Sequence, residues 1–233
     1  MDKTHIPLFK VFMSPYAPEK VKKVLESGFI GEGDQVKLFE KNLKNYTGCE
    51  NLITTNSATS AIHLAIHLVK NNIHGYKKYN WPLVEEGDEV LTCPLTCTAT
   101  NWPVLANNLN LKWVDVDKNT CNMCLDDLKN KLSEKTKIII LVHWGGNPVD
   151  LGKIEEIKTY SEKKYGFKPI IIEDAAHAFG TEYEGKKLGN LKNSHIVVHS
   201  FQAIKHITSI DGGCIIFPDK KLTKQARLMR WYG

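Results

Sequence analysis

The stretch from Asn56 to Ala61 gathers small hydroxyl residues where a helix is expected to begin. At a helix start, free backbone N–H groups and the helix dipole favour an anion such as a phosphate, here around Ser57, Ala58 and Thr59. Serine and threonine are also the usual residues that cap a helix. Taken alone, the stretch is therefore explained by capping as well as by phosphate binding.

A carboxylate and an imidazole follow an apolar run further along the chain. The segment Glu173-Asp174-Ala175-Ala176-His177 ends the run 169–173 and places His177 one turn after Asp174. An aspartate in this place could hold a protonated ring nitrogen, because its negative charge favours the protonated form. The competing interpretation is that Asp174 caps an adjacent helix.

An amine lies near the end of another predicted strand. Lys205 comes five residues after Ser200, and Asp211-Gly212-Gly213 follow it. A lysine at the inner end of a strand is partly removed from water, which makes its amine nucleophilic. The glycines permit close backbone packing or a tight turn. An isolated lysine is otherwise usually exposed, so this signal is weak by itself.

A fourth stretch of small residues, 96–101, follows the predicted strand 89–93 and contains Cys97. Its small side chains leave room for a flat ligand, although helix capping and close packing would explain them too. Together the four stretches supply a phosphate anchor, a carboxylate for a ring nitrogen and an amine that can form a Schiff base. These are the separate demands of pyridoxal 5'-phosphate.

The elements that would position these residues alternate between β-branched runs and helical patterns from residue 52 onward. Uninterrupted apolar runs such as 138–142 and 170–172 are typical of strands buried on both faces. The alternation predicts an α/β protein with a mostly parallel sheet covered by helices. Because such sheets bind ligands at the carboxyl ends of their strands, the four stretches should meet at one edge. The expected strands are 52–55, 89–93, 111–116, 137–143, 169–173, 195–201 and 213–217, and the expected helices are 58–70, 97–107, 124–132 and 150–164.

The first fifty residues precede this alternation. Apolar spacing predicts a helix over 17–27 and a second amphipathic helix from Val36 to Tyr46. The glycine-rich turn 28–33 between them is not a dinucleotide-binding fingerprint, since no strand precedes it. The polar stretch 71–86 is expected to be a surface excursion within the same domain.

Composition places the 233-residue chain among ordinary globular proteins, with 42% hydrophobic and 24% charged residues. The net charge of +5 comes from scattered lysines rather than a basic stripe, which argues against nucleic-acid binding. No apolar stretch is long enough to span a membrane, and residues 1–5 are too polar for a signal peptide, so a cytoplasmic protein is expected. The six cysteines are then expected to be reduced thiols. Only Cys121 and Cys124 have metal-like spacing, and without further ligands nearby no metal site is expected.

The order and spacing of several motifs resemble the DegT/DnrJ/EryC1/StrS aminotransferases, which are pyridoxal-phosphate enzymes of the aspartate aminotransferase fold (fold type I). The resemblance covers essentially the whole chain and is carried by Gly28–Gly33, Gly87–Val90, Thr96–Thr100, Glu173–Gly180 and the block from Ser200 through Lys205 to Gly213. It implies that residues 1–233 form an N-terminal arm and the large cofactor-binding domain. Family members continue into a C-terminal small domain, so the chain is expected to be truncated.

The resemblance also implies a role for each matching residue. Lys205 matches the lysine that binds the cofactor covalently, and Asp174 matches the carboxylate paired with the pyridine nitrogen. These two are the implied catalytic residues. His177 lies where the family carries Gln or His against the ring oxygen of the cofactor. Phosphate contacts are implied for Ser57, Ala58, Thr59 and Ser200.

Two matching positions depart from the family pattern. Cys97 stands where many members place an aromatic ring that stacks on the cofactor, and its polarizable sulfur could partly substitute for that ring. Asp211 stands where glutamate is common.

The activity implied by the resemblance is transamination of a nucleotide-linked keto sugar, chiefly a 4-keto-6-deoxy sugar, with glutamate as amino donor and a homodimer as the working unit. A branch of the family carries histidine in the lysine position and catalyses sugar dehydration. Lys205 in that position, with His206 after it, favours transamination. A third interpretation is a cofactor-binding remnant without turnover, because the small domain is missing.

Overall fold

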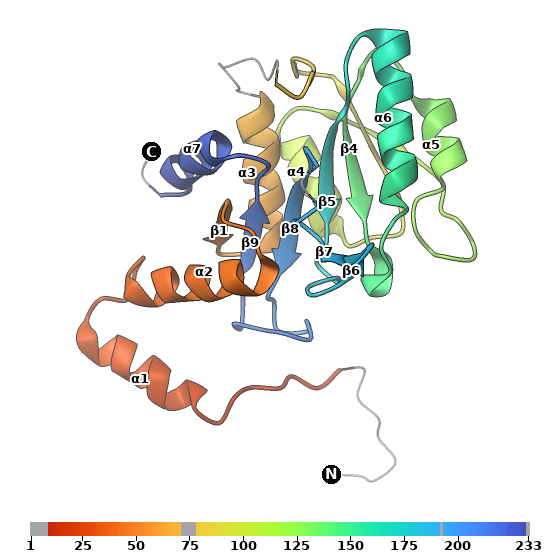
Figure 1. The fold of residues 1–233 in the computed structure, drawn as a ribbon. Helices are drawn as coiled ribbons and strands as arrows, with labels where there is room; N and C mark the ends of the chain where they lie inside the picture. Colours follow the sequence, from red (N-terminus) through yellow and green to blue (C-terminus); the bar gives the residue numbers. More distant parts are fainter. Residues whose placement is uncertain (1–8, 71–77, 192, 232–233) are drawn as a thin grey trace.

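A seven-stranded sheet between two layers of helices forms the body of the chain in the computed structural model, which describes residues 9–70, 78–191 and 193–231 (Figure 1). Of the surface excursion predicted over 71–86, residues 71–77 lie outside the described residues. None of the described helices has the length and apolarity needed to cross a membrane.

The sheet is parallel except for one strand. In sheet order the strands are β1 (Leu52–Thr55), β9 (Gly213–Ile216), β8 (Ile196–Ser200), β5 (Ile170–Asp174), β4 (Thr136–Val142), β2 (Glu89–Thr92) and β3 (Asn110–Trp113). Strand β9 is antiparallel to both of its neighbours, and the other strands share one direction. Their carboxyl ends therefore lie at one edge of the sheet, beside the start of β9.

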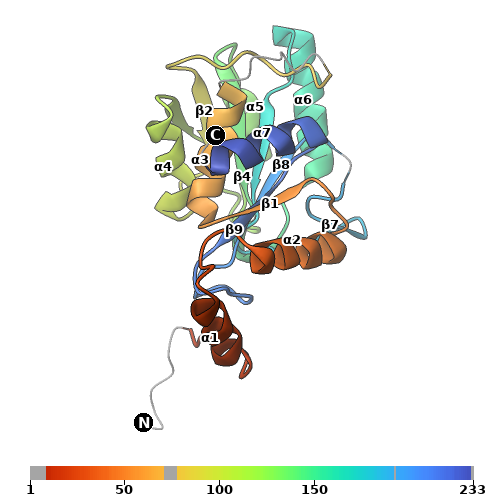
Figure 2. The same ribbon diagram turned by 90° about the vertical axis from the view of Figure 1, so that its left-hand side faces the viewer.

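The predicted apolar runs form the two central strands, and alternate residues serve opposite faces. Ile138 and Ile140 pack in one core layer, and Ile139 and Leu141 pack in the other. The first layer is covered by α3 (Ala58–Lys70), α4 (Thr98–Ala106) and α7 (Lys220–Arg230), and the second by α2 (Asp34–Thr47), α5 (Leu125–Lys131) and α6 (Leu151–Tyr165) (Figure 2). Burial on both faces explains why these strands carry no polar alternation.

The N-terminal arm stands apart from this body (Figures 1 and 2). Its helix α1 spans Ala17–Ser27, as predicted, and contributes no buried residue. Gly28 ends the helix with a φ of +73°, a left-handed conformation that glycine adopts without strain. Phe12, Phe29 and Ile30 are all exposed, so the arm presents an apolar surface to its surroundings.

Most predicted elements match the structure within two residues, but four of the described elements were missed. They are α7, the short hairpin of β6 (Glu182–Tyr183) and β7 (Lys186–Lys187), and the 3-10 turn η1 (Trp144–Gly146). The predicted strand 111–116 was too long. Strand β3 ends at Trp113, because beyond it the chain turns to form a bridge between Val116 and Met123.

Candidate active site

A cavity of about 360 Å³ opens at the carboxyl edge of the sheet. Its walls come from the segments that follow β1, β2, β5 and β8, from Val142 at the end of β4 and from Asp211, two residues before β9. The cavity brings together every side chain that the sequence predicted for the site: Ser57, Ala58, Thr59, Cys97, Asp174, His177, Ser200 and Lys205. The strand-end rule therefore placed these residues at one location.

The start of α3 forms one wall. Ser57 caps the helix, since its Oγ accepts a 3.1 Å hydrogen bond from the N–H of Ser60. In the described part of the chain, the N–H groups of Ala58 and Thr59 have no acceptor. Capping and anion binding are thus compatible here, because the hydroxyl serves the cap and the two N–H groups remain available for a phosphate.

Gly213 allows this helix start to lie directly against β9. A Cβ at position 213 would be 2.6 Å from both Ala58 N and Ser57 C, which are backbone atoms that cannot rotate away. The close packing expected from the glycine pair is therefore confirmed at Gly213. Ser200, at the end of β8, is buried beside it.

Asp174 ends β5 with its carboxylate at the cavity wall and only 6% of its surface exposed. Its Oδ1 accepts a 3.0 Å hydrogen bond from the N–H of Ala176, and its Oδ2 accepts a 2.6 Å bond from Thr100 Oγ1. The interpretation of Asp174 as a helix cap is wrong, because the following residues, 175–180, form turns instead of a helix. Each carboxylate oxygen has a further lone pair that can accept a hydrogen bond from a group inside the cavity.

Lys205 is half-buried and lines the cavity, in a loop whose backbone is fixed at Phe201. The N–H of Phe201 donates to the carbonyl of Gly212 (2.9 Å), and the carbonyl of Phe201 accepts from Thr208 Oγ1 (2.9 Å). The alternative of a fully exposed lysine is therefore wrong. The neighbouring His206 is not among the lining residues, and its Nε2 lies 3.0 Å from the carbonyl oxygen of Phe179.

His177 lies between the cavity and the turn η1. Its ring meets the edge of Trp144, with 5.4 Å between the ring centroids. Burial, followed by the nearby Lys205 cation, lowers the pKa of His177 below its ordinary value, although the Asp174 charge opposes this shift. A neutral imidazole results, which can donate one hydrogen bond into the cavity. Cys97 lies exposed on the wall beside α4.

A row of polar side chains, buried except for Glu155 at its end, lies on the opposite face of the same strands. Glu173 Oε2 is 3.0 Å from His143 Nε2, Glu173 Oε1 is 2.5 Å from His195 Nδ1, and His195 Nε2 is 2.9 Å from Glu155 Oε1. His143 Nδ1 accepts from the N–H of Val149, so its Nε2 carries the proton that Glu173 accepts. Burial raises the pKa of Glu173, but the hydrogen bonds from the two histidines outweigh it and lower that pKa to about 2.

This network was not predicted from the sequence, and neither was the role of Thr100. The only available signal for the network was the pair of adjacent acids at the end of the run 169–173. In a strand, adjacent side chains point to opposite faces. One acid therefore had to face away from the ligand edge, into the layer between the sheet and α6.

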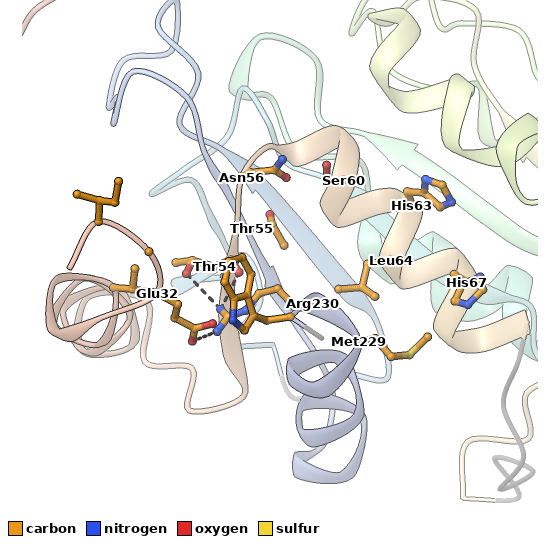
Figure 3. A pocket seen from close by; sticks show the side chains of 14 residues that line it. Glu32, Thr54, Thr55, Asn56, Ser60, His63, Leu64, His67, Met229 and Arg230 are labelled. Atoms are coloured by element: carbon orange, nitrogen blue, oxygen red, sulfur yellow. Dashed lines mark hydrogen bonds and ion pairs between the residues drawn. The ribbon is translucent and has the colours of Figure 1, made fainter. Parts of the chain in front are cut away.

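A larger cavity of about 910 Å³ adjoins the first across the start of α3 (Figure 3). It lies between β1, α3, α7 and the turn before α2, and its lining contains no lysine. Its principal cation, Arg230, is already bound to Glu32 and Glu40. Although it is larger, this cavity lacks an amine, and the one carboxylate in its lining, Glu32, is already paired with Arg230, so the smaller cavity is the candidate active site.

The residues of the smaller cavity fit pyridoxal phosphate in three respects. Two free N–H groups could donate to a phosphate, the carboxylate of Asp174 could accept from a ring nitrogen, and Lys205 supplies an amine. Because Gly213 has no Cβ, the start of α3 and its two free N–H groups can lie directly against β9. Any larger residue at position 213 would displace this helix start.

The chain is similar in sequence and in fold to proteins of one family. Residues 15–233 match the model of the DegT/DnrJ/EryC1/StrS aminotransferase family. Among solved structures, AtS13 from Actinomadura melliaura is 41% identical with a TM-score of 0.89, and the match covers 100% of this chain and 58% of that one. The sugar aminotransferase CalS13 from Micromonospora echinospora is 39% identical with a TM-score of 0.88, and the match covers 98% and 58%.

Two further relatives extend the comparison. A GDP-4-keto-6-deoxymannose-3-dehydratase with a trapped PLP-glutamate geminal diamine is 26% identical with a TM-score of 0.83, over 96% of this chain and 54% of that one. The uncharacterized protein MJ1066 of Methanocaldococcus jannaschii is 32% identical over 229 residues, which are 95% of this chain and 54% of that protein. The chain spans a little more than half the length of these relatives. With the family match extending over nearly all of it, the chain belongs to the DegT/DnrJ/EryC1/StrS aminotransferase family.

Proposed function

We propose that the chain is a pyridoxal-phosphate-dependent aminotransferase that transfers an amino group from glutamate to a nucleotide-linked keto sugar, chiefly a 4-keto-6-deoxy sugar. The observation that carries the proposal is the meeting of Lys205, Asp174 and the start of α3 in one cavity. The likeness to the sugar aminotransferase CalS13 supports the reaction class. Residues 1–233 would then be the N-terminal arm and the large cofactor-binding domain.

Binding of the cofactor uses both ends of the cavity. Ala58 and Thr59 would donate their N–H groups to the phosphate, and the hydroxyls of Ser57 and Ser200 would lie beside it. At the other end, Asp174 would accept a hydrogen bond from the protonated ring nitrogen. When bound, pyridoxal phosphate withdraws electrons from the carbon that bears the amino group.

Lys205 would perform the proton transfers. Its Nζ would hold the cofactor covalently until the amine of the donor takes its place. The freed amine of Lys205 would then act as the base that takes a proton from the donor and as the acid that gives a proton back. His177, as a neutral imidazole, would donate a hydrogen bond to the ring oxygen, and Cys97 would contact the face of the ring.

Sugar dehydration is the second candidate, because one relative is a GDP-4-keto-6-deoxymannose-3-dehydratase. The positions of Lys205 and His206 favour transamination. Lys205 lines the cavity, whereas His206 is bound to the Phe179 carbonyl and is absent from the lining. A non-catalytic remnant is the third interpretation, and it predicts cofactor binding without turnover.

The proposal includes a homodimer in the cytoplasm. The exposed apolar side chains of the N-terminal arm support self-association, because contiguous apolar surface on a soluble protein usually marks an interface. The cysteines support a reducing compartment, since all six are free thiols.

The experiment is a visible absorption spectrum of the purified chain with pyridoxal phosphate, before and after addition of glutamate. A yellow band that bleaches with glutamate would support transamination, and the amino sugar formed from a keto-sugar nucleotide would then identify the acceptor. A band that forms but does not bleach would favour the remnant. Loss of water from the sugar without gain of nitrogen would favour the dehydratase.

A further inference from the structure

Thr100 lies in the first turn of α4 and is fully buried. Its Oγ1 donates a 2.6 Å hydrogen bond to Oδ2 of Asp174, although the two residues are 74 positions apart. The N–H of Ala176 donates to Oδ1 of the same carboxylate at 3.0 Å. Each oxygen of Asp174 thus accepts one bond from the protein, which fixes the orientation of the carboxylate at the cavity wall.

Thr96 extends this arrangement into a chain of hydroxyls. Its Oγ1 lies 2.7 Å from Oγ1 of Thr100, and distance alone allows either group to be the donor. A threonine hydroxyl has a single hydrogen, and Thr100 donates its own to Asp174. Thr96 is therefore the donor in the second bond. Both hydrogens point toward the carboxylate, an arrangement in which each hydrogen bond strengthens the other.

We propose that Thr100, supported by Thr96, is a positioning residue that holds the carboxylate of Asp174 in the orientation that accepts a hydrogen bond from the ring nitrogen of pyridoxal phosphate. The inference rests on the proposed function, which gives Asp174 this partner. Thr100 acts through Asp174, so its effect depends on the presence of the ring nitrogen. A threonine that merely fills space in the core would affect every ligand of the cavity equally.

The test compares pyridoxal phosphate with 1-deazapyridoxal phosphate, an analogue in which a C–H group replaces the ring nitrogen. The full chain is freed of cofactor and titrated with each compound, and binding is followed by tryptophan fluorescence. Thr100→Val keeps the shape of the side chain and removes the hydroxyl, whereas Thr100→Ser keeps the hydroxyl. Thr98→Val is the matched control, because Thr98 is an exposed threonine of the same helix outside the cavity lining.

We expect Thr100→Val to weaken binding of pyridoxal phosphate by about 10- to 100-fold, the range for a hydrogen bond to a charged group. Binding of the analogue should change by less than about threefold, because the ring nitrogen is missing. Thr100→Ser and Thr98→Val should bind both compounds as the wild type does. Thr96→Val should show a smaller loss in the same direction, and it provides the comparison if Thr100→Val does not fold.

Equal weakening of both compounds by Thr100→Val would overturn the inference, and so would unchanged binding of pyridoxal phosphate. A wild-type chain that binds neither compound would overturn the proposed function itself and this inference with it. The two failures are distinguishable, because the second is seen before any substitution is made.

Discussion

Lys205 and His206 are neighbours in the sequence but have different surroundings. The lysine lines the cavity, and the histidine is held by the carbonyl of Phe179 at 3.0 Å. This difference is the reason why we propose transamination rather than dehydration, because only a group inside the cavity can move a proton there. The positions of Lys205 and His206 therefore distinguish the two proposed reactions.

Lys205→Ala should abolish the covalent visible band and lower the rate of the glutamate half-reaction by about 100- to 10,000-fold, the usual contribution of a positioned acid or base. His206→Ala should keep the band and most of the rate, because its side chain lies outside the cavity lining. Stopped-flow absorbance of both variants provides the measurement. A band that survives in Lys205→Ala would show that another amine binds the cofactor.

Gly213→Ala should weaken cofactor binding by about tenfold or more, because the added Cβ displaces the start of α3 and its free N–H groups. The same overpacking should lower the free energy of unfolding by about 1–3 kcal/mol. Gly31→Ala is the matched control, since a Cβ there meets no atom within 4 Å. Titration with pyridoxal phosphate and urea unfolding test both effects. Wild-type affinity in Gly213→Ala would contradict the close-packing argument.

The strands β4, β5 and β8 have two roles. Their carboxyl ends border the candidate active site, and one of their faces carries a polar network that is buried except for Glu155. Glu173 joins His143 of the segment after β4 to His195 before β8, and Glu155 continues the network onto α6. His199, on β8, is also fully buried, and its Nε2 has no partner among the described residues. These groups make the stability of the sheet depend on pH.

Burial lowers the pKa of His199 to about 4 from its ordinary 6.5. A folded-state pKa below the unfolded value means that the unfolded chain binds the proton better, so stability is complete above pH 6.5 and is lost as pH falls toward 4. We expect wild type to lose about 2 kcal/mol of unfolding free energy from this residue between pH 7.5 and 5. His199→Leu should remove that loss, whereas His63→Leu, at an exposed position, should keep it.

Urea unfolding at the two pH values measures the difference. An identical pH dependence in His199→Leu and wild type would contradict this assignment. Glu173 acts in a lower window: its pKa of about 2 lies below the ordinary 4.5, so its contribution is complete above pH 4.5 and is lost between 4.5 and 2.

The sequence predicted the elements whose patterns are local. Continuous apolar runs identified β4 and β5, and the strand-end rule brought eight predicted residues to one cavity. Helix α7 was missed because only Leu222, Thr223 and Ala226 are buried, which leaves a thin apolar pattern. The bond from Thr100 to Asp174 could not be predicted, because it joins residues 74 positions apart and depends on how α4 packs beside β5.

At the scale of the whole molecule, the chain combines a well-packed sheet domain with an arm that buries nothing of its own helix. The chain spans about half the length of its relatives, whereas the residues that we propose to hold the cofactor are all present in it. The cavity that holds Lys205 and Asp174 is formed entirely within the described body. Attachment of the cofactor is therefore the step that this chain should perform by itself.

The most direct test of the account is to treat the full chain with pyridoxal phosphate, reduce it with borohydride and map the modified peptide by mass spectrometry. Hydride reduces the carbon–nitrogen double bond between the lysine and the cofactor to a stable secondary amine, which marks the attachment site. We expect modification at Lys205 and none in Lys205→Ala. Modification spread over exposed lysines, or none at Lys205, would contradict this expectation.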